Sequence, residues 1–136
     1  VEAARTAELY TTVTRVADLE AFRSHLADRL WNLVAVEIDD RSVNLFEAEY
    51  PERPCFLLGA EVGGVPADLL DEARLVVRIP QWGLVPSLNL AIAGSIVLYD
   101  FLAKLHREAR LDRPHGGLVD ESSGQPEGED DADHRG

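Results

Sequence analysis

The feature that most constrains this chain is a helix-forming stretch that is apolar on nearly all sides. Between Leu88 and Leu98 only Asn89 and Ser95 are polar. A helix of this composition has to be covered on nearly all sides. The segment Pro86-Ser87 predicts the start of this helix, with Ser87 as the N-cap. We therefore expect a helix over residues 88–105 that either crosses a domain core or carries a partner subunit on one side.

Strand and helix patterns alternate along the rest of the chain. The strand patterns span residues 31–38, 55–58 and 75–79, and the helical patterns span residues 18–30, 67–73 and 88–105. This alternation is typical of an α/β layer structure with a parallel sheet. The continuous apolar run over 55–58 predicts a strand that is covered on both faces. In the first helix, Asp18 is the expected N-cap, and the expected apolar face consists of Leu19, Phe22, Leu26 and Leu30.

The charge distribution divides the chain into two parts. The chain has 136 residues and a net charge of −12, and half of that charge lies in residues 120–136. We expect one domain over residues 1–113 and a disordered tail over 114–136, where Gly, Ser, Pro and acidic residues dominate. Lys104 is the single lysine. An acidic chain binds nucleic acid poorly without local contacts, because phosphate binding needs clustered cations.

Cysteine and hydropathy patterns exclude several classes of protein. Cys55 is the single cysteine, so neither a disulfide framework nor a cysteine-based metal site is available. We therefore expect no metal, and a lone cysteine fits a reducing cytoplasm. No apolar run has the length of a membrane span, so we expect no membrane association.

Two glycine-bearing loops follow the second and third strand patterns, at residues 59–64 and 80–86. Ligands of parallel α/β sheets bind outside the carboxyl ends of the strands, where both loops are expected to lie. The first loop is not a P-loop, because it lacks the Gly-Lys-Ser/Thr ending. Its glycines fit either a nucleoside-sized cofactor or a tight turn needed for packing. Glu61 fits either a base or a loop carboxylate that accepts bonds from backbone N–H groups.

Taken together, the two loops resemble the SpoU/TrmH branch of the SPOUT superfamily, the S-adenosylmethionine-dependent RNA ribose 2′-O-methyltransferases. The family motif Leu-Gly-x-Glu-x-x-Gly is matched by Leu58-Gly59-Ala60-Glu61-Val62-Gly63-Gly64. The motif Ile-Pro-x-x-Gly-x-x-x-Ser-Leu-Asn is matched by Ile79-Pro80, Gly83 and Ser87-Leu88-Asn89, and Leu98-Tyr99-Asp100 matches the end of the helix that follows. The resemblance covers residues from about 11 to 105.

The resemblance implies a fold, a cofactor and partners. The fold is the SPOUT α/β fold with a trefoil knot in its C-terminal half, and the chain is expected to form a homodimer through helix 88–105. S-adenosylmethionine is the implied cofactor, bound by Leu58, Gly59, Ile79, Pro80, Gly83 and Leu88. Glu61, Ser87 and Asn89 match the polar active-site positions. The implied substrate is tRNA or rRNA; the sequence does not identify which RNA or which nucleotide.

One family motif has no match. Family members carry an earlier Asn-x-Gly segment and a helix with Arg-Thr-Ala, whose arginine is thought to activate the ribose hydroxyl. Arg5-Thr6-Ala7 stands too close to the next segment to be that motif. We therefore expect the chain to lack the first strand–helix unit of the fold. The alternative function is a catalytically inactive module that keeps the cofactor pocket and the dimer helix.

Overall fold

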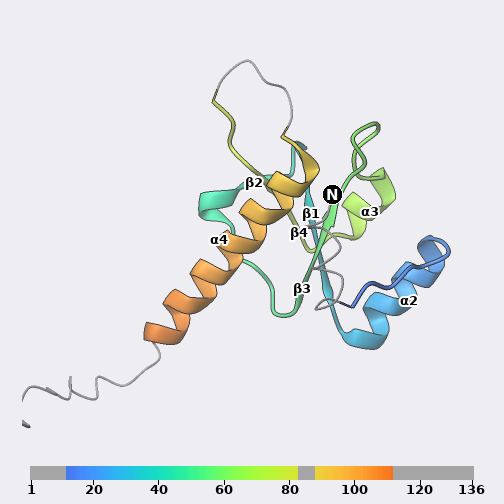
Figure 1. Ribbon diagram of the computed structural model, residues 1–136, viewed down its shortest axis with the longest axis horizontal. Coiled ribbons are helices and arrows are strands. Elements are labelled where there is room, and N and C mark those ends of the chain that lie inside the picture. The colour runs from blue at the N-terminus through green and yellow to red at the C-terminus, as the bar shows by residue number, and fades with distance from the viewer. Residues whose placement is uncertain (1–11, 83–87, 112–136) are drawn as a thin grey trace, which may run out of the picture.

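The computed structural model of the protein describes residues 12–82 and 88–111. In chain order, its elements are α2 (Leu19–Arg29), β1 (Asn32–Val36), β2 (Val43–Asn44), η1 (Leu45–Glu47), β3 (Pro54–Leu58), α3 (Ala67–Glu72), β4 (Leu75–Arg78) and α4 (Leu90–Leu111). The four strands form one parallel sheet in the order β2-β4-β1-β3. Helices α2 and α3 lie on one side of this sheet and α4 lies on the other (Figure 1). The predicted parallel α/β architecture is therefore confirmed.

The apolar run of β3 was expected to be covered on both faces. Phe56 packs against buried residues on one face of the sheet and Leu57 against buried residues on the other. All residues of β3 are half-buried, so the cover is partial. Among the described strands, β3 pairs with β1 alone and forms an edge of the sheet. A short apolar run does not specify how many neighbouring strands it has, so the sequence could not distinguish an edge strand from a central one.

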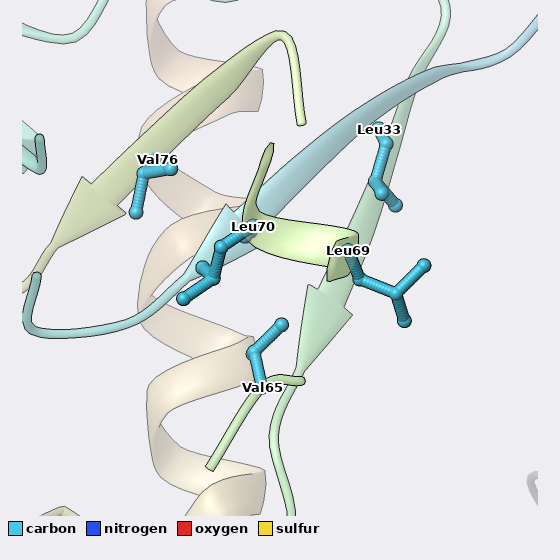
Figure 2. Close-up of a cluster of buried hydrophobic side chains, with 6 residues drawn as sticks. Leu33, Val65, Leu69, Leu70 and Val76 are labelled. Atoms are coloured by element: carbon cyan, nitrogen blue, oxygen red, sulfur yellow. The ribbon is translucent and has the colours of Figure 1, made fainter. Parts of the chain in front are cut away.

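Two hydrophobic clusters hold the layers together. Successive side chains of a strand point to opposite faces of the sheet, so β1 contributes to both clusters. On one face, Leu33 and Ala35 pack with Val76 of β4 and with Leu69 and Leu70 of α3 (Figure 2). On the other face, Val34 and Val77 pack with Val97 of α4 and Leu45 of η1.

Helix α2 begins where the sequence predicts. The side chain of Asp18 accepts a hydrogen bond of 2.8 Å from the backbone N–H of Ala21. Phe22 and Leu26 pack against the first cluster as expected. Leu30, however, is 76% exposed and caps the helix with a left-handed backbone. The prediction therefore extended the apolar face one turn too far, since in the structure this face ends at Leu26.

Helix α4 begins later than predicted. Asn89 caps it, because the Asn89 Oδ1 accepts hydrogen bonds from the backbone of Ala91 (2.9 Å) and Ile92 (3.4 Å). The helix starts at Leu90 and continues to Leu111, beyond the predicted end at residue 105. Ser87, the predicted N-cap, lies outside the described residues.

A polar network fixes the middle of α4 against η1 and the segment that follows it. Lys104 donates from Nζ to the carbonyl oxygens of Leu45 (2.7 Å) and Ala48 (2.9 Å) and pairs with Asp100 (2.9 Å). Asp100 also accepts a hydrogen bond of 2.8 Å from the hydroxyl of Tyr50. Burial, followed by the contact with Asp100, raises the pKa of Tyr50 above its ordinary value. The network therefore holds η1 in one place on the helix.

Candidate functional site

A cavity of about 680 Å³ lies at the carboxyl ends of β1, β3 and β4. Its walls come from the ends of these strands, from the loop after β3 and from the first turn of α4. The lining residues are Val36, Glu37, Ile38, Leu58, Gly59, Ala60, Glu61, Val62, Gly64, Arg78, Ile79, Gln81, Leu88, Asn89, Leu90 and Ala93. The carboxyl edge of a parallel sheet is the place where ligands of such folds bind.

Most of the predicted site residues meet at this cavity. Leu58, Gly59, Glu61, Ile79, Leu88 and Asn89 all line it. Pro80 does not line it, although its neighbours on both sides do. Gly83 and Ser87 lie outside the described residues. Described residues of the two motifs, far apart in sequence, thus line one cavity.

The loop after β3 is closely packed against itself. Ala60 and Gly64 form an isolated bridge, in which the N–H of Gly64 donates to the carbonyl of Ala60 at 3.2 Å. A Cβ atom added to Gly59 would lie 2.3 Å from the carbonyl carbon of Gly64 and 2.4 Å from the nitrogen of Val65. Real Cβ atoms do not approach backbone so closely. Of the two interpretations left open by the sequence, the tight turn therefore explains Gly59.

Glu37 is a site residue that the sequence analysis missed. Its Oε2 accepts a hydrogen bond of 3.0 Å from the N–H of Val65, and its Oε1 accepts one of 2.9 Å from the N–H of Ile38. The carboxylate thus joins the end of β1 to the end of the glycine loop. Its position directly after a buried strand pattern was the only signal in the sequence, and that signal does not reveal the contact with Val65.

Arg78 and Gln81 were also missed. Arg78 is the last residue of β4 and is the one basic residue among the described residues that line the cavity. Its guanidinium donates from Nη1 to the carbonyl of Ser42, which is buried. The cavity wall therefore carries one cation beside two acidic side chains, Glu37 and Glu61.

The part of the chain that the structure describes lacks two other features. Over 12–82 and 88–111, no cluster of His, Cys, Asp and Glu side chains has the arrangement of a metal site. In the same ranges, no helix is both long enough and apolar enough to cross a membrane.

Comparison with known proteins identifies relatives of this chain. It is 31% identical over 107 residues to the tRNA (guanosine(18)-2′-O)-methyltransferase of Escherichia coli K12, a match that covers 78% of this chain and 43% of the relative. It is 32% identical over 95 residues to the enzyme of the same name from Thermus thermophilus, with 70% of this chain and 48% of the relative covered. The chain thus spans less than half the length of these relatives.

Solved structures agree with this relationship. The TrmH/SpoU tRNA modifying enzyme of Aquifex aeolicus superposes with a TM-score of 0.59 at 26% identity, over 73% of this chain and 50% of that one. An AdoMet-bound rRNA methyltransferase from Sinorhizobium meliloti superposes with a TM-score of 0.53 at 32% identity, over 60% of this chain and 33% of that one. Residues 1–99 match the SpoU rRNA Methylase family. With the parallel sheet and the cavity between the two motif loops, this match shows that the chain belongs to the SpoU rRNA Methylase family and has its α/β SPOUT fold.

Proposed function

We propose that this chain is the cofactor-binding and dimer-forming portion of an S-adenosylmethionine-dependent RNA ribose 2′-O-methyltransferase. The observation that carries the proposal is the cavity formed jointly by the loop after β3 and the segment between β4 and α4. Both segments match the family motifs, and relatives of this chain are named as a tRNA methyltransferase and as an AdoMet-bound rRNA methyltransferase.

The residues of the cavity fit S-adenosylmethionine. A volume of about 680 Å³ lies within the range of roughly 300–1,000 Å³ that holds drug-sized ligands. Leu58, Ile79 and Leu88 supply apolar surface for the adenine. The backbone near Gly59 and Pro80, and Gly83 in the second loop, are the proposed contacts for the polar groups of the nucleoside.

The acidic side chains of the cavity fit the charge of this cofactor. When bound, S-adenosylmethionine supplies a methyl group on a positively charged sulfur. Glu37 and Glu61 give the cavity a negative lining, and opposite charges attract more strongly in a partly dehydrated site than in water. Glu37 already holds two backbone N–H groups, so Glu61 is the carboxylate that remains at the loop surface.

The protein's chemical task in this proposal is positioning. Glu61, Ser87 and Asn89 are proposed to face the RNA and to orient the ribose hydroxyl and its proton toward the cofactor. Asn89 uses its Oδ1 to cap α4, which fixes the side chain and leaves the amide Nδ2 as the donor that it offers to a ligand. A hydroxyl oxygen held in line with the methyl group needs no metal ion.

We propose the assembly and the boundaries from the same family membership. Two copies of the chain pair through α4, and the C-terminal half of the methyltransferase domain forms the trefoil knot. The domain spans residues 1–113, and residues 114–136 form a tail outside it. The proposed substrate is a tRNA or an rRNA, and the proposed location of the reaction is the cytoplasm.

Isothermal titration with S-adenosylmethionine tests the pocket through a matched pair of variants. Ala93 lines the cavity, whereas the exposed Ala91, two residues earlier in the same helix, does not. Leucine is a good helix former at both positions, so stability should be retained in each variant. We expect one cofactor per chain in the parent, a loss of affinity of at least about tenfold in Ala93→Leu because the new side chain fills the cavity, and unchanged affinity in Ala91→Leu.

Two results would contradict the proposal. One is the absence of binding heat at millimolar cofactor when circular dichroism shows a folded parent chain. The other is equal affinity in the two leucine variants, which would place the cofactor outside this cavity.

A further inference from the structure

Two large aromatic side chains lie exposed and stacked on each other near the cavity. Phe46 of η1 is 65% exposed and Trp82 is 83% exposed. Their ring centroids are 6.4 Å apart and their planes differ by 24°. Exposing aromatic rings of this size to water costs free energy. Neither ring belongs to a hydrophobic cluster, so packing of the core does not explain why these residues are aromatic.

The sheet topology places this pair beside the proposed site. Strands β2 and β4 are parallel neighbours, and Asn44 at the end of β2 pairs with Arg78 at the end of β4. Phe46 comes two residues after Asn44, and Trp82 comes four residues after Arg78, so both follow the carboxyl edge of the sheet. Gln81, which directly precedes Trp82, lines the cavity, as does Arg78. The aromatic pair therefore adjoins the cavity at the side of β4.

The pair is held on a rigid support. The N–H of Phe46 donates to Oδ1 of Asn44 at 3.0 Å, and Leu45, the preceding residue, is buried in the second cluster. Lys104 of α4 binds the carbonyl groups of Leu45 and Ala48 on either side of Phe46 and Glu47. The backbone that carries Phe46 is thus fixed while its ring stays in solvent.

We propose that Phe46 and Trp82 form a stacking platform for a nucleobase of single-stranded RNA, next to the nucleotide that is methylated. The inference rests on the proposed function, because it assigns the RNA contact of the same site. Bases that have left a helix stack on aromatic side chains, and this contact does not depend on net charge. A chain of net charge −12 gains little affinity from phosphate contacts, so a neutral stacking surface suits it. Arg78 is the cation in the cavity wall that reaches the adjoining phosphate.

The fluorescence of Trp82 provides a direct test. The chain has two tryptophans, and Trp31 lies just before β1, at the opposite end of the sheet, where Arg29 and His25 contact it. In the full chain carrying Trp31→Phe, emission reports Trp82 alone. We expect a short single-stranded oligoribonucleotide of mixed sequence to quench this emission. An abasic ribose–phosphate oligomer of the same length should leave the emission unchanged.

Affinity measurements with variants complete the test. By fluorescence anisotropy of the labelled oligonucleotide at low salt, Trp82→Ala and Phe46→Ala should each weaken binding by about 5- to 100-fold. Trp82→Phe should restore most of the affinity, because it retains a ring. Titration with S-adenosylmethionine should give the same affinity in all these variants, since neither ring lines the cavity.

The outcomes separate the inference from the proposed function. Equal RNA affinity in the parent and Trp82→Ala, or equal quenching by RNA with and without bases, overturns the stacking platform even where the cofactor binds normally. A Trp82→Ala variant that keeps its RNA affinity but changes mass in light scattering assigns the ring to a protein contact and also overturns it. Base-dependent quenching in a chain that binds no cofactor supports the platform and contradicts the proposed function.

Discussion

The loop after β3 requires glycine at residues 59 and 63, for two different reasons. At Gly59 a side chain would collide with the backbone of Gly64 and Val65, which cannot move without opening the loop. At Gly63 the backbone has a φ of 92°, a left-handed value, but an added Cβ would meet nothing within 4 Å. The first glycine is needed for space and the second for conformation. Both effects act on the loop that forms a wall of the cavity.

These two positions give a prediction with a built-in control. Gly59→Ala should lower the free energy of unfolding by roughly 3 kcal/mol, because packed backbone has to shift. Gly63→Ala should cost only about 1 kcal/mol, the strain of an L-residue in a left-handed conformation. Urea denaturation followed by circular dichroism measures both values. Equal losses in the two variants would show that the close approach at Gly59 is absent in solution.

At the scale of the element, α4 has two different apolar sides. Ile96 and Val97 pack against the second hydrophobic cluster. On another side of the helix, Leu98, Leu102 and Leu105 are each about half exposed, and Tyr99 is more so. The all-round apolar pattern predicted a helix that needs cover on every side, and within the described part of the chain only one side receives it. The proposed dimer would cover the other.

Aspartate placed on each side of α4 should have separable effects. Leu102→Asp should leave the subunit folded but weaken the proposed dimer by about a hundredfold, because an interface would then bury an unpaired carboxylate. Ile96→Asp should instead destabilise the subunit itself, by roughly 3 kcal/mol.

Light scattering over a concentration series measures the first effect, and thermal unfolding measures the second. A parent chain that stays monomeric at high concentration would argue against the dimer.

The elements also show what could be predicted from the sequence. Periodicity identified α2, α3, β1 and β4 because their apolar residues repeat with the spacing of one buried face. It missed the start of α4, because Ser87 and Asn89 are both good N-cap residues and only the observed bonds from Ala91 and Ile92 distinguish them. It also missed Glu37, whose role depends on a contact with Val65 across the cavity edge. Local patterns cannot reveal contacts between segments that are distant in sequence.

At the scale of the whole molecule, the net charge and the expected lack of a match to the first family motif both argue for weak catalysis by these 136 residues alone. The net charge of −12 repels RNA at low salt. Ribose hydroxyls are very weak acids, so the group that assists their deprotonation matters to the rate. Arg5 lies outside the described residues, and its spacing in the sequence leads us to expect that it is not the family arginine.

We therefore expect very slow methyl transfer by the 136-residue chain, lower by about 100- to 10,000-fold than in a chain with the complete motif set. Transfer of labelled methyl groups to unmodified tRNA and to rRNA transcripts measures this difference. The comparison chain carries a relative's Asn-x-Gly and Arg-Thr-Ala segment in front of Val1. Fast transfer by the shorter chain that is lost in Arg5→Ala would show that Arg5 is the motif arginine after all.

The strand order has a consequence for how the chain reaches its native state. Strand β4 is the last of the four along the sequence, yet it lies between β2 and β1. Among the described strands, β2 pairs with β4 alone, so it has no partner among them until β4 has been synthesised and inserted. Every pairing in the sheet joins segments that are distant along the chain, and such high contact order slows folding, because long loops must close first. During translation, β1 and β3 can pair early, but the other edge of β1 stays open to unwanted pairing until β4 arrives.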